Sequence, residues 1–119
     1  MSAPQILFDV TGHVATVTLN RPEAMNALAG DMRQILLQGL AGYASDANVR
    51  CIVITGAGTA FCAGGDIAAM TKWQTESDTS VLEATLETAE KVVRLLRALP
   101  QPVIAAVNGP AAGGGMNMA

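Results

Sequence analysis

The chain is poor in charge and in the side chains that build metal centres. Only 14% of its 119 residues are charged, seven are Lys or Arg, and histidine occurs once. A single histidine argues against a histidine-based zinc site, and we expect no bound metal. Phosphate backbones are bound by clustered Lys and Arg. With a formal net charge of −3, the sequence predicts no nucleic-acid partner.

Cysteine and long apolar runs are also scarce. Cys51 and Cys62 form no C-x-x-C pair and have no His at metal spacing. Residues 1–5 lack the basic head and apolar stretch of a signal peptide, and no apolar run approaches the roughly 20 residues that span a bilayer. We therefore expect a reduced, cytoplasmic protein without a membrane partner.

What the chain does have is apolar periodicity that switches between strand and helix. Half of the residues are hydrophobic, which is enough for a packed core. Runs at 6–10 and 14–19 predict an antiparallel hairpin, and 51–55 and 103–107 predict buried strands of a parallel sheet. Helical spacing appears at 31–43, where Asp31 is a candidate cap, and at 80–99. The fold class is therefore α/β.

Two glycine-rich segments each follow a predicted buried strand. Residues 56–66, the first glycine loop, lead into a predicted short helix at 67–70 and a polar, exposed stretch at 71–78. Residues 108–115, the second glycine loop, lead into a helix that begins near 113, where the sequence stops. A chain ending in the first turn of a helix suggests that part of the fold is missing.

Three familiar glycine motifs are excluded. Gly56 and Gly58 fit the start of a dinucleotide fingerprint, but Phe61 stands at its third glycine. The sequence contains neither a Gly-Lys-Ser/Thr phosphate loop nor a G-x-S-x-G nucleophile elbow. Two interpretations remain. Either both loops are merely tight turns, or their backbone N–H groups converge on one substrate oxygen as an oxyanion hole.

Three segments resemble the crotonase (enoyl-CoA hydratase/isomerase) superfamily. They are N-R-P-E-A-M-N-A-L at 20–28, A-F-C-A-G-G-D-I at 60–67 and P-V-I-A-A-V-N-G-P-A-A-G-G-G at 102–115. The resemblance covers essentially the whole chain. It implies that residues 1–119 are the N-terminal part of a ββα-spiral domain, apparently truncated, that assembles as a homotrimer or homohexamer.

The resemblance also implies a substrate and a site. The substrate would be an acyl-CoA thioester, with no cofactor apart from the coenzyme A of the substrate itself. The amides of Ala63 and Gly114 would hold the thioester oxygen and stabilise an enolate. The implied substrate-binding positions are Ala24, Met25, Ala27, Ala63, Gly64, Gly65, Asp66, Ile67 and Gly114.

One position departs from the hydratase pattern. Asn117 stands where the hydratases carry their first catalytic Glu, and an amide cannot act as a general base. The second hydratase Glu would lie beyond Ala119. Hydration and isomerisation are therefore both open, and so is a non-catalytic acyl-CoA-binding or assembly subunit. Two residues of the first glycine loop are expected to be structural rather than catalytic. Asp66 is interpreted as a helix cap or loop brace rather than an acid or base, and Cys62 as a small packed residue rather than a nucleophile.

Overall fold

The computed structural model describes residues 3–76 and 79–119. Four strands form one sheet in the order β1-β2-β3-β4, with β1 at Ile6–Thr11, β2 at Val14–Leu19, β3 at Cys51–Gly56 and β4 at Val103–Ala106. β1 and β2 form the predicted antiparallel hairpin, while β2–β3 and β3–β4 are parallel. The predicted α/β class, hairpin and parallel strands are therefore confirmed.

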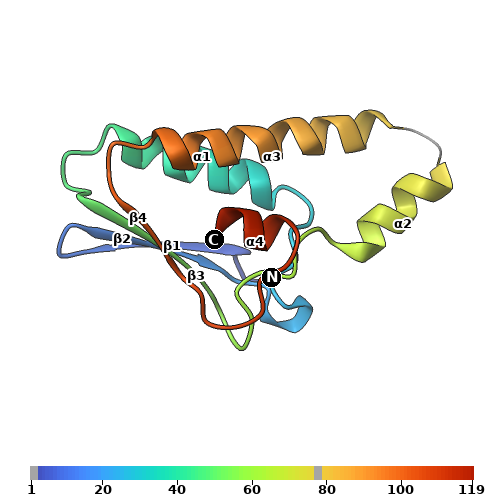
Figure 1. The fold of residues 1–119 in the computed structure, drawn as a ribbon, viewed down its shortest axis with the longest axis horizontal. Coiled ribbons are helices and arrows are strands. Elements are labelled where there is room, and N and C mark those ends of the chain that lie inside the picture. The colour runs from blue at the N-terminus through green and yellow to red at the C-terminus, as the bar shows by residue number, and fades with distance from the viewer. Residues whose placement is uncertain (1–2, 77–78) are drawn as a thin grey trace.

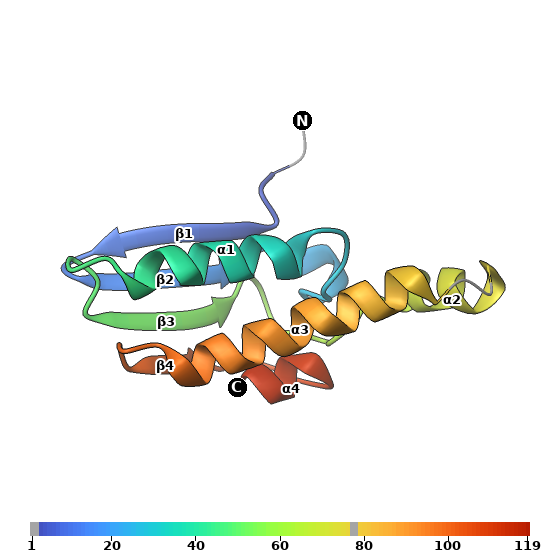
Figure 2. The same ribbon diagram turned by 90° about the horizontal axis from the view of Figure 1, so that it is seen from above.

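Two long helices cover one face of the sheet, as Figures 1 and 2 show. α1 spans Met32–Ala44 and α3 spans Ser80–Ala98, close to the predicted bounds. The core lies between these helices and the sheet. Its largest fully buried apolar side chains are Val17, Leu19, Met32, Leu36, Leu40, Ile52, Ile54, Phe61 and Cys62.

Several local predictions are wrong. α2 spans Ile67–Glu76, so residues 71–76 are helical rather than a polar loop; residues 77 and 78 lie outside the described part. Asp31 precedes α1 but makes no side-chain capping bond. β4 is a sheet edge rather than a buried strand, and Ile104 on it is 52% exposed. Apolar composition alone did not distinguish a central strand from an edge strand.

The segments that follow strands β2, β3 and β4 lie at one end of the sheet. A 3₁₀ turn at Pro22–Ala24 follows β2, the first glycine loop follows β3, and the second follows β4. α4, at Gly114–Met118, starts directly from the second glycine loop, beneath α3 in Figure 1. Ligands of open α/β sheets bind at the carboxyl ends of parallel strands, which is where these segments meet.

Candidate functional site

Backbone hydrogen bonds fasten the two glycine loops to each other. Cys62 donates its N–H to the Pro110 carbonyl at 3.2 Å and accepts from the Ala112 N–H at 3.0 Å, forming an isolated bridge with Ala111. Gly64 has φ +97°, and a Cβ there would lie 3.0 Å from the Ala112 oxygen, so only glycine fits without strain. The same Cβ position is 3.5 Å from the Gly114 nitrogen.

A buried asparagine, which the sequence analysis did not single out, holds the first glycine loop through side-chain hydrogen bonds to its backbone. Asn26 is fully buried in the left-handed conformation, at φ +57°. Its Nδ2 donates to the Ala57 and Ala60 carbonyls, both at 2.9 Å, and its Oδ1 accepts from the Arg21 N–H at 2.8 Å. Asn26 belongs to the N-A-L part of the segment at 20–28, which could have drawn attention to it. Because a buried side-chain amide must have its hydrogen bonds satisfied, such a residue is expected to brace neighbouring backbone.

An ion pair joins the turn at residues 20–28 to the end of the same loop. Arg21 Nη1 lies 3.2 Å from Asp66 Oδ2 and donates to the Ala27 carbonyl at 2.7 Å. Asp66 also accepts the Met70 N–H through its backbone carbonyl at the start of α2. The contact with Arg21 agrees with the interpretation of Asp66 as a brace for the loop.

Of the two residues Ala63 and Gly65 in the first glycine loop, it is Gly65 whose amide is free. Ala63 donates its N–H to the Met25 carbonyl at 3.0 Å, so the prediction that this amide is open to a substrate is wrong. Leu28 bonds to the peptides on both sides of Gly65, donating to Gly64 and accepting from Asp66. In such a bridge the central residue directs its own N–H away from the partner strand. Within the described residues, neither the Gly65 N–H nor the Gly114 N–H has a partner.

Gly65 and Gly114 line the same cavity. Its volume is about 260 Å³. The walls come from α1, α2, α3, α4 and the two glycine loops, and they are mainly apolar. The lining residues are Leu28, Arg33, Leu36, Gly65, Met70, Leu86, Ala89, Val92, Val93, Gly114, Asn117 and Met118. Asn117 therefore faces the same space as both free amides.

Burial shapes the electrostatics beside the cavity. It raises the pKa of the Cys62 thiol, an effect opposed by the Gly64 N–H bond and by the charge of Arg33. The thiol is fully buried and neutral, as expected of a packed residue rather than a nucleophile. Burial also lowers the pKa of Arg33, although the Cys62 side chain acts in the opposite direction. No carboxylate or histidine is among the described residues that line this cavity.

The other predicted binding residues lie around the turn at 20–28 and the start of α2. Ala27 is buried, Ala24 is half-buried, and Met25 is 45% exposed. Ile67 is 79% exposed. None of these four lines the cavity, and their contact with a substrate stays a prediction. Over residues 3–76 and 79–119 no group of His, Cys, Asp and Glu is arranged to hold a metal ion, and no helix is long and apolar enough to cross a membrane.

The described residues thus form an α/β sheet with two joined glycine loops, and Gly65 and Gly114, whose amides have no partner among these residues, line one mainly apolar cavity. Residues 9–119 match the family model described as enoyl-CoA hydratase/isomerase, and the chain belongs to that family. The part of the crotonase fold that it spans has the expected α/β architecture.

Individual relatives agree with this assignment. The chain is 44% identical to a putative enoyl-CoA hydratase/isomerase, YngF, from Bacillus subtilis, over 96% of this chain and 43% of the relative. It is 40% identical to the 1,2-epoxyphenylacetyl-CoA isomerase of Escherichia coli, over 96% and 44%. The solved structure of a putative enoyl-CoA hydratase from Streptomyces coelicolor matches with a TM-score of 0.87 and 37% identity, over 98% and 44%. The chain thus spans less than half the length of these relatives.

Proposed function

We propose that these residues form the carbonyl-holding part of an acyl-CoA enzyme of the hydratase/isomerase type. The observation that carries the proposal is the pair of unpartnered amides, Gly65 N–H and Gly114 N–H, on one cavity. Two such donors stabilise the negative oxygen that forms when a proton leaves the carbon next to a thioester carbonyl. Because the donors belong to the backbone, loops of Gly and Ala are sufficient for this task.

The chain departs from the hydratase pattern in its acid–base residues. Asn117 lines the cavity, but its amide can only orient water or a carbonyl. This observation favours either isomerisation with an acid/base placed elsewhere or, as a second candidate, a subunit that binds acyl-CoA without turning it over. We also propose that the protein is cytoplasmic and assembles as a homotrimer or homohexamer.

A direct test replaces one backbone N–H at a time. Incorporating an α-hydroxy acid at residue 65 or 114 changes the amide to an ester and removes the donor without altering any side chain. Turnover of a 2-enoyl-CoA and a 3-enoyl-CoA by the intact protein that carries these residues is followed spectrophotometrically. Each ester is expected to lower kcat by about 10²- to 10³-fold.

Residue 63 provides the matched control. An ester there removes the bond to the Met25 carbonyl and is expected to change stability more than kcat. A large kcat loss at 63 with none at 65 would restore Ala63 as the donor. Tight binding of both thioesters without turnover would support the binding subunit, and failure to bind either would remove the proposal.

A further inference from the structure

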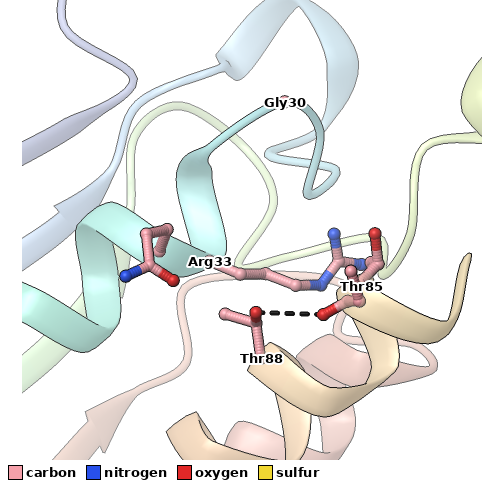
Figure 3. A pocket seen from close by; sticks show the side chains of 6 residues that line it. Gly30, Arg33, Thr85 and Thr88 are labelled. Carbon is pink, nitrogen blue, oxygen red and sulfur yellow. Dashed lines mark hydrogen bonds between the residues drawn. The ribbon is translucent and has the colours of Figure 1, made fainter. Parts of the chain in front are cut away.

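Arg33 is the one charged side chain among the described residues lining the cavity of the two amides. It projects from the first turn of α1, directly after the buried Met32. It also lines a second, adjoining hollow of about 140 Å³ together with Gly30, Gln34, Ala84, Thr85 and Thr88. Figure 3 shows the side chain extended from α1 toward α3, with the guanidinium ending beside Thr85.

No carboxylate pairs with this guanidinium within residues 3–76 and 79–119. Its one hydrogen bond is a long contact of 3.5 Å from Nη1 to the Leu28 carbonyl. Two of the four other arginines are paired, Arg21 with Asp66 and Arg94 with Glu90. A half-buried cation without a counter-ion is unfavourable. The lowered pKa of Arg33 has the same cause.

The guanidinium lies close to the proposed oxygen site. A Cβ placed on Gly65 would be 3.6 Å from Arg33 Nη2. An acyl group whose thioester oxygen rests on the amides of Gly65 and Gly114 would therefore extend its chain past this cation. The other walls of the cavity are mainly apolar, with Leu36, Leu86 and Val92 among them.

We propose that Arg33 binds a carboxylate on the far end of the acyl group, so that the substrate is the CoA thioester of a short dicarboxylic acid. This inference rests on the proposed function, because it takes the position of the thioester from the two amides. A guanidinium binds a carboxylate with two parallel hydrogen bonds, and that pairing is strongest where water is excluded. A purely apolar acyl chain would instead bury the cation without a partner.

The CoA moiety carries anionic phosphates, so the test must separate the two sources of negative charge. Calorimetry on the intact protein compares glutaryl-CoA with butyryl-CoA, and glutaryl-pantetheine with butyryl-pantetheine, which lack the nucleotide. The saturated acyl groups are not turned over as enoyl substrates. We expect the glutaryl member of each pair to bind at least 10-fold more tightly.

Variants then assign the preference to Arg33. Arg33→Met keeps the apolar stem and is expected to weaken glutaryl binding about 10- to 100-fold, while butyryl binding changes less than about 3-fold. Arg33→Lys should restore part of the preference. Arg94→Met removes an exposed, paired arginine on α3 and should alter neither affinity.

The outcomes separate this inference from the proposed function. Equal weakening of glutaryl-CoA and butyryl-CoA, with no effect on the pantetheine thioesters, would assign Arg33 to a phosphate and overturn the inference. Tight butyryl-CoA binding with no glutaryl preference in the unmodified protein would overturn it even if every Arg33 variant failed to fold. Failure of all four thioesters to bind would overturn the proposed function as well.

Discussion

Replacing Gly115 by alanine should force the two glycine loops apart. A Cβ on Gly115 would overlap the Cys62 carbonyl oxygen and lie 2.7 Å from the Cys62 Cβ. Ordinary contact begins at 3.4 Å, so the backbones must separate by at least about 0.7 Å. Overpacking of this kind costs about 1–3 kcal/mol. The displaced helix start also carries the Gly114 amide, and misplacement approaching 1 Å at a reacting centre can lower a rate by about 10²-fold.

Two glycines provide the controls. A Cβ on Gly114 would lie 3.8 Å from Leu28 Cδ1, so Gly114→Ala should change the free energy of unfolding by less than about 0.5 kcal/mol. Gly42, inside α1, has nothing within 4 Å, so Gly42→Ala should stabilise by up to about 1 kcal/mol with unchanged kinetics. Urea unfolding and steady-state turnover of the intact protein measure both effects. A Gly115→Ala variant that matched the unmodified protein in midpoint and kcat would refute the close packing of the loops.

Further outcomes are expected for three residues, Asn26, Cys62 and Asn117. Asn26→Ala should cost more than about 2 kcal/mol in urea unfolding, because the Arg21 N–H and two carbonyls lose a buried partner. A destabilisation below about 0.5 kcal/mol would contradict the bracing role. Burial raises the pKa of Cys62, so its thiol keeps its proton where the unfolded chain ionises. The protonated thiol therefore favours the folded state, and this contribution to the free energy of unfolding is present below about pH 8.5 and declines above it. Native alkylation followed by mass spectrometry should modify half-buried Cys51 before Cys62; the reverse order would show an accessible Cys62. Asn117→Glu should raise any 2-enoyl-CoA hydration rate, and an unchanged or abolished rate would place the acid/base elsewhere.

The element types were predictable because they depend on local periodicity. Strands β2 and β3 and helices α1 and α3 carry apolar residues at spacings that favour one secondary structure, and β1 was recognisable as a run of strand-forming residues before a turn. α2 was mostly missed because residues 71–76 are polar except for Trp73, and a helix that extends beyond the sheet needs no apolar stripe (Figure 2). The exposure of β4 was missed because the strand is apolar although it is partly exposed. Its apolar residues resemble those of a covered strand, and only the strand order reveals the edge.

The region of the site was predictable, but the identity of its donor was not. Both glycine loops were recognisable, and Gly114 does present a free amide. The choice between Ala63 and Gly65 depends on which way each peptide plane faces. Partners distant in the sequence fix that direction. The Met25 carbonyl binds the Ala63 N–H, and the N–H and carbonyl of Leu28 bind the peptide groups on either side of Gly65. Residue spacing within the loop contains no information about either contact.

The same contacts explain why separate motifs of the sequence serve one site. Three residues of the turn at 20–28 bind the first glycine loop. Asn26 binds its start and Arg21 binds its end. Leu28 binds the peptide groups on both sides of Gly65. These residues hold the amide in place and line little of the cavity themselves. The groups proposed to face the acyl chain, Arg33 and Asn117, line the cavity from α1 and α4, outside this framework. In the proposed site, this framework would hold the thioester oxygen, while the choice of acyl group and of proton transfer would depend on side chains outside it.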